Sequence, residues 1–180
     1  DTRAVEVLLE RGRKELLDEK YEAASKTFND PMQAPDFMHL TKGRQFRTLL
    51  LASEAARGRE DYLAAHEFMV IACEYPDAGA SEWVLRTQLA TSVEAWSDAG
   101  LAMKTVAKQW PESLGDFHHE TVQWTLMKMD RDKKLAVERL ELLNALFDAN
   151  FQLEWHVEPA FLWRELVMQA VERKDLPPAR

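Results

Sequence analysis

The sequence predicts an all-α fold, and three observations lead to this prediction. Apolar residues recur every three or four positions along most of the chain, as they do on one face of a helix. The sequence shows no sustained period-two alternation and no Asn-Gly or Asp-Gly hairpin turn, the features that mark strands. Only 6 Gly and 7 Pro occur in 180 residues, with 46% apolar and 30% charged residues, a composition typical of ordered helical proteins. We therefore expect about nine helices of roughly 10 to 18 residues with short connections.

The helical pattern can be followed along the chain. At residues 3–20, "RAVEVLLERGRKELLDEK" places its apolar residues on one stripe. The segment 81–96 opens with Ser81, which suits an N-cap, and continues at helical spacing. Residues 135–147 and 158–174 behave in the same way. Breaks are expected at Pro31 to Pro35, Arg57 to Asp61, Pro76 to Ala80, Asp98 to Gly100, Pro111 to Phe117 and Asp130 to Lys133.

One set of residues recurs at intervals of 41, 34 and 37 residues, anchored on four alanines: Ala24, Ala65, Ala99 and Ala136. Three positions before each alanine stand Tyr21, Tyr62, Trp96 and Lys133. Four positions after it stand Phe28, Met69, Met103 and Leu140. Twelve positions before it stand Gly12, Ser53, Thr87 and Trp124, of which the first three are small or modest in size. A repeat of this length indicates stacked helix pairs.

This pattern resembles the tetratricopeptide repeat (TPR) family, whose unit is an antiparallel helix pair of 34 residues. A small residue on the first helix and an alanine on the second let the two backbones approach, and large neighbours fill the gap to the next pair. Trp83, Trp96, Trp124 and Trp163 fall on positions of the repeat core and are expected to fill such gaps. The resemblance implies a right-handed superhelical array of about four pairs in a single domain, 1–180, with a terminal helix. Its units are 4–38, 45–78, 80–113 and 117–150, followed by the helix 158–175.

The terminal helix is interpreted as the first helix of a fifth unit. Trp163 stands sixteen residues before Ala179, the offset that also separates Trp83 from Ala99. The chain is therefore expected to be part of a longer repeat protein, with residues 158–175 covering the fourth pair.

Charge argues against some classes of partner. The net charge is −8, and residues 61–180 hold the whole acidic excess. An acidic surface repels phosphate backbones and anionic lipids, so neither nucleic acid nor a membrane surface is expected as the partner. The apolar runs are too short for membrane insertion. Cys73 is the single cysteine and argues weakly for a reducing compartment. The cytoplasm is therefore slightly favoured, with a periplasmic or secreted location still open because the native N-terminus is not seen.

The sequence offers little for catalysis. The cluster His118, His119 and Glu120 is the nearest approach to a metal or catalytic site. Adjacent residues on a helix point about 100° apart, so the two imidazoles cannot chelate one ion as an i, i+4 pair would. We expect a solvated helix start there, no cofactor, no metal and no enzymatic activity.

The resemblance places a binding surface on the first helix of each pair, where family members commonly bind peptides in a concave groove. Carrying the groove positions over by their offset from each alanine gives the candidate residues Arg13, Arg47, Glu54, Arg57, Gln88, Thr125 and Lys128. Basic groups in such a groove suit a carboxylate or an acidic peptide. The expected function is a non-catalytic scaffold that binds a protein segment. The alternative is a self-associating structural array, with weak homo-oligomer contacts through the chain ends.

Overall fold

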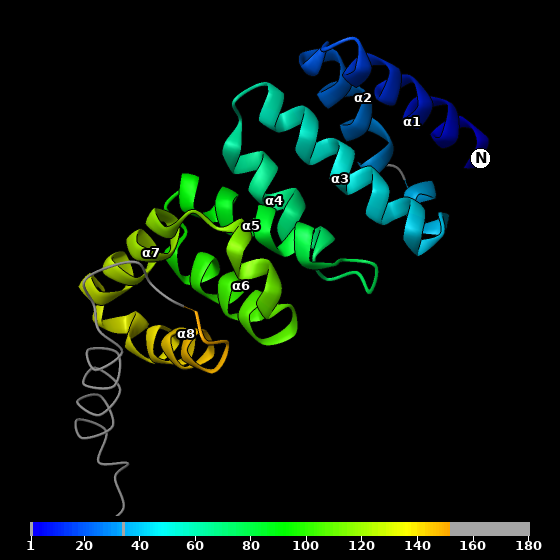
Figure 1. The fold of residues 1–180 in the computed structure, drawn as a ribbon. Helices are drawn as coiled ribbons and strands as arrows, with labels where there is room; N and C mark the ends of the chain where they lie inside the picture. Colours follow the sequence, from blue (N-terminus) through cyan, green and yellow to red (C-terminus); the bar gives the residue numbers. More distant parts are fainter. Residues whose placement is uncertain (1, 34, 152–180) are drawn as a thin grey trace, which may run out of the picture. The chain divides into compact units, whose positions relative to one another are not determined.

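The computed structural model describes residues 2–33 and 35–151, and within these residues the protein is all-helical, without strands (Figure 1). The α-helices are α1 (Thr2–Leu17), α2 (Tyr21–Gln33), α3 (Lys42–Gly58), α4 (Tyr62–Ala72), α5 (Ala80–Ser92), α6 (Trp96–Gln109), α7 (His119–Arg131) and α8 (Ala136–Asp148). Short 3-10 helices are η1 (Pro35–His39), η2 (Pro111–Asp116) and η3 (Lys133–Leu135). The all-α prediction is confirmed. The expected terminal helix 158–175 lies outside the described residues.

The chain forms two compact units, Asp1–Glu94 and Ala95–Arg180. The first contains α1 to α5 and the second contains α6 to α8. The third expected repeat, 80–113, is divided between them, since α5 belongs to the first unit and α6 to the second. The right-handed superhelix stays a prediction, and each unit is described by itself.

Within the first unit each helix packs against the next, α1 on α2, α2 on α3, α3 on α4 and α4 on α5 (Figure 1). The repeated small residues lie where these helices cross. A Cβ added at Gly12 of α1 would come within 2.8 Å of the Phe28 ring on α2. On α3, the Ser53 hydroxyl donates a hydrogen bond of 3.0 Å to the carbonyl of Ala65 on α4. Small side chains at these positions therefore allow the close helix pairs that the repeat pattern predicts.

The turns before the anchor alanines share a feature that the repeat analysis missed. Glu19, Glu60 and Glu94, each five positions before its alanine, adopt the left-handed conformation with φ of 57°, 61° and 59°. In the first turn the N–H of Lys20 donates to the Glu15 carbonyl at 2.8 Å, and in the second Asp61 donates to Ala56 at 2.9 Å. These six-to-one hydrogen bonds close the helix C-termini in the Schellman manner. The turn is thus repeated in geometry as well as in sequence.

One expected break is wrong. α6 runs without interruption from Trp96, so the chain does not break at Asp98 to Gly100. The helix pair turns earlier, at the left-handed Glu94. Gly100 is instead a buried interior residue of α6, where an added Cβ would lie 2.8 Å from the Met129 side chain of α7. The glycine permits a close helix contact and does not end the helix.

In the second unit α6 packs against both α7 and α8, and the expected register of the fourth repeat is wrong. Trp124 is 49% exposed, and Ala136 is exposed as well. The buried sides of α7 and α8 are formed by Val122, Thr125, Met129, Arg139, Leu142, Leu143, Ala145 and Leu146. One position along a helix is a rotation of about 100°. Thr125 rather than its bulky neighbour therefore faces the core, and Trp124 is not a core filler.

The close contact of α3 with α4 gives a first prediction. Ala65 has no exposed surface, so Ala65→Leu should lower the free energy of unfolding by about 1–3 kcal/mol through overpacking. Glu67→Leu, an exposed change on the same helix, is the matched control and should have little effect. Urea titration followed by circular dichroism measures both. Equal stability of the two variants would contradict the packing assigned to Ala65.

The left-handed turn gives a second prediction. The left-handed conformation costs an L-residue about 1–2 kcal/mol, and a glycine at the same position avoids this cost. Glycine also loses more conformational entropy on folding, which offsets about 0.5–1 kcal/mol of the gain. Glu60→Gly should therefore raise the free energy of unfolding by up to about 1 kcal/mol. Glu67→Gly, in the exposed middle of α4, should lower it by about 1 kcal/mol. A loss of stability in both variants would contradict the assigned turn.

A third prediction concerns the pairing of α1 with α2. The Thr27 hydroxyl donates to the Glu15 carboxylate at 2.6 Å. This hydrogen bond, assisted by Arg11, holds the pKa of Glu15 below its ordinary value. A lowered folded-state pKa contributes stability that is present above the unfolded pKa, about 4.3 for Glu, and is lost as the pH falls through the folded pKa.

Thr27→Val should therefore reduce stability at neutral pH and flatten its decline with acid below about pH 4.3. Thr91→Val, which removes a hydroxyl that donates to the Thr87 carbonyl, should leave the acid slope unchanged. Urea unfolding at a series of pH values gives both slopes. The hydrogen bond is not linked to folding if the Thr27 variant keeps the wild-type slope.

Candidate functional site

Two hollows lie on the first unit, one on each side of α3, and they form the candidate binding site. The α1–α3 hollow has a volume of about 270 Å³. The α3–α5 hollow has a volume of about 520 Å³. Helix α3 thus supplies a wall to both.

The α1–α3 hollow combines a small apolar surface with several charges. Its lining residues are Glu6, Leu9, Glu10, Arg13, Arg44, Arg47, Thr48 and Leu51. Leu9 and Leu51 are half-buried, and Arg44 forms an ion pair with Glu6. Arg13 and Arg47 are exposed, and neither has a hydrogen bond or ion pair with any residue that the structure describes. Their guanidinium groups can therefore donate to a ligand without losing an existing partner.

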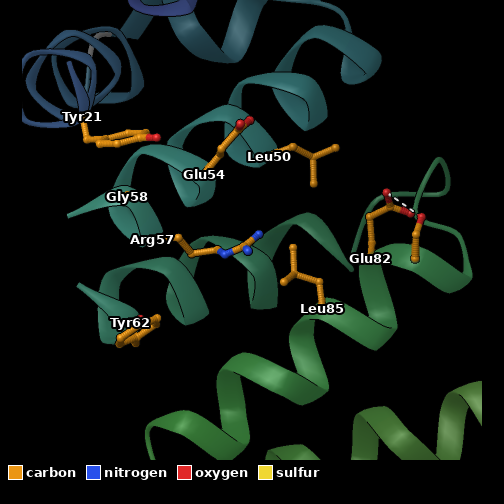
Figure 2. Close-up of a pocket in the computed structure, with 9 residues that line it drawn as sticks. Tyr21, Leu50, Glu54, Arg57, Gly58, Tyr62, Glu82 and Leu85 are labelled. Carbon is orange, nitrogen blue, oxygen red and sulfur yellow. Dashed lines mark hydrogen bonds between the residues drawn. The ribbon is translucent and has the colours of Figure 1, made fainter. Parts of the chain in front are cut away.

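The α3–α5 hollow is larger and more aromatic (Figure 2). Its lining residues are Tyr21, Leu50, Glu54, Arg57, Gly58, Tyr62, Ser81, Glu82 and Leu85. Leu50 and Leu85 are half-buried, whereas Glu54 and Arg57 are exposed. Figure 2 shows Arg57 extending from α3 toward Leu85. Within the described part of the chain, neither Glu54 nor Arg57 has a hydrogen bond or an ion pair.

The walls of the α3–α5 hollow are held by local contacts. The Glu82 carboxylate accepts from the Gly79 N–H at 2.9 Å and from the Ser81 hydroxyl at 3.1 Å, which caps the start of α5. At the other end, Tyr21 lies so close to Gly58 that an added Cβ would overlap its ring. Gly58 therefore lets the first residue of α2 pack onto the last residue of α3.

Gln45, a residue that the sequence analysis did not single out, fixes the start of α3. Its side chain is fully buried and donates to the carbonyls of Phe37, Met38 and Leu40 at 3.2, 3.2 and 3.0 Å. It also accepts from the Tyr75 hydroxyl at 2.8 Å. Burial raises the pKa of Tyr75, so this hydroxyl remains a donor at neutral pH. One amide thus ties α3 to η1 and to the connection after α4.

The sequence-predicted site residues divide into three groups. Arg13 and Arg47 line the α1–α3 hollow, and Glu54 and Arg57 line the α3–α5 hollow. Gln88 is exposed on α5 but is not among the nine residues that line the α3–α5 hollow.

Thr125 and Lys128 belong to the second unit. The expectation for Thr125 is wrong: it has no exposed surface, and its hydroxyl donates to the Thr121 carbonyl at 2.8 Å. The Lys128 ammonium lies over the rings of Trp96 and Trp124, 5.4 and 5.5 Å from their centroids. The repeat offset fails here because the buried face of α7 lies one position further along than the offset predicts, which turns Thr125 toward the core.

Two residues of the His118, His119 and Glu120 cluster lie on the surface. His118 is exposed and forms the N-cap of α7, and Glu120 is exposed in its first turn. No group of three His, Cys, Asp or Glu side chains that could hold a metal occurs within the described ranges 2–33 and 35–151.

Cys73 is a buried free cysteine. None of the helices described is both long and apolar enough to cross a membrane.

Searches against protein-family models, curated protein sequences and solved structures gave no match to this chain.

Proposed function

We propose that this protein is a non-catalytic, TPR-like scaffold that binds a segment of another protein along α3. One observation carries the proposal: two hollows flank α3, and each lies between the first helices of successive pairs. Both combine half-buried leucines with arginines that have no partner among the described residues. Apolar surface beside unpaired donors suits a peptide, which offers both side chains and hydrogen-bonding groups.

The repeated architecture supports this proposal. The first three units share a buried alanine, a small or modest residue twelve positions earlier and a left-handed Glu in the turn. Repeats of this kind place equivalent surfaces side by side, which forms extended binding faces. On this basis we include a right-handed superhelix in the proposal, with the two hollows on its concave side.

Self-association is the second candidate, favoured by exposed apolar residues on α1. Val7 is 69% and Leu17 79% exposed, and exposed apolar side chains can form contacts between copies. Sedimentation at several protein concentrations separates the candidates. A mass that rises with concentration favours the array, and a monomer at all concentrations favours the scaffold.

A fourth prediction tests the binding surface. Partners captured from an extract of the producing cells would be identified by mass spectrometry, and their affinity then measured by titration with purified components. Arg13→Glu with Arg57→Glu should weaken binding about tenfold or more, because both hollows lose a donor and gain a repelling charge. Helical content should not change, since both residues are exposed.

The matched control is Lys14→Glu with Lys108→Glu, which changes the net charge equally. Both lysines are exposed and line neither hollow. This control should bind as the wild type does. Wild-type affinity in the arginine double variant would exclude the two hollows as the binding surface.

A further inference from the structure

We propose that the α1–α3 hollow is a carboxylate subsite, which takes an Asp or Glu side chain of the bound protein segment. This inference rests on the proposed function and adds a chemical preference to one of the two hollows. The two hollows present opposite net charges to a ligand.

In the α1–α3 hollow the ion pair of Glu6 with Arg44 neutralises one charge of each sign. Arg13, Arg47 and Glu10 remain, so the lining has one positive charge in excess. Arg13 projects from α1 and Arg47 from α3. Both arginines line the same hollow, and each guanidinium group is a planar donor of the kind that suits a carboxylate.

The hollow is large enough for a single side chain. Its volume of about 270 Å³ lies near the lower end of the roughly 300–1,000 Å³ of ordinary ligand pockets. Half-buried Leu9 and Leu51 give it apolar surface against which the methylene groups of Asp or Glu can pack. The buried Thr48 hydroxyl donates to the Arg44 carbonyl at 2.8 Å, so the arginines are the donors that remain for the ligand.

The α3–α5 hollow has the opposite charge balance. Arg57 is accompanied by Glu54 and by the capping carboxylate of Glu82, which leaves one negative charge in excess. The uncharged part of the lining includes two tyrosines and two leucines. This hollow suits an apolar or aromatic side chain, so the preference for an acidic residue should be confined to one position of the ligand.

The positions of the hollows set a minimum spacing within the ligand. The α3 residues that line the two hollows are centred about seven residues apart, or about 11 Å along the helix axis. Because an extended chain advances about 3.3 Å per residue, at least about three residues should separate the acidic residue from the apolar one.

The test is selection from a random peptide display library against the immobilised full chain. The wild-type protein should enrich peptides with Asp or Glu at one position and an apolar residue at least about three positions away. Arg13→Gln with Arg47→Gln should lose the acidic preference, while Lys14→Gln with Lys108→Gln should keep it. For a selected peptide made synthetically, changing the acidic residue to its amide should weaken wild-type binding about 10- to 100-fold.

The outcomes separate the two proposals. Selected peptides without acidic enrichment would overturn the carboxylate subsite and leave the scaffold function standing. The subsite is likewise overturned if acidic enrichment survives in the arginine variant, or disappears equally in the lysine control. A library that yields no binding peptide would count against the scaffold function and therefore against the subsite as well.

Discussion

The first unit depends on how closely the two helices of each pair approach. Gly12 faces the ring of Phe28, and Ser53 is hydrogen-bonded to the backbone of Ala65. With larger residues at these crossings the helices would move apart, and the cores beneath them would lose their contacts. One core joins α3 to α4 through Leu49, Ala56 and Met69. The other joins α1 and α2 to α3, through Leu16, Ala24, Phe28, Ala52 and Ala55. Helix α3 belongs to both cores.

The same position makes α3 the centre of the candidate site. Its buried face joins the two helix pairs, and its remaining surface borders the α1–α3 hollow and the α3–α5 hollow. Gln45 ties its first turn to neighbouring connections, and Gly58 ends it against Tyr21. A helix held at both ends presents Arg47 and Arg57 from a rigid base, which lowers the entropy lost when they bind a ligand.

Much of this arrangement follows from the sequence alone. Helical periodicity indicates the all-α class, because one face of each helix must be buried. The recurrence around Ala24, Ala65 and Ala99 identifies the crossing residues, since only small side chains permit close backbones. The same offsets select Arg13, Arg47, Glu54 and Arg57, all of which line one of the two hollows. The repeat offsets are enough to identify these residues where successive repeats keep the same register.

Tertiary structure decided the features that depend on a neighbouring helix. The one-position change that buries Thr125 and exposes Trp124 arises where α7 meets α6, and Gly100 is an interior residue there because Met129 packs onto it. The left-handed Glu residues show no ordinary turn signal, because glycine or asparagine usually occupies that conformation. The ion pair of Glu6 with Arg44, which leaves Arg13 and Arg47 unpaired, joins side chains 38 positions apart in the chain. Periodicity records which face of a helix is apolar, whereas the partner of each face is determined only when the helices pack.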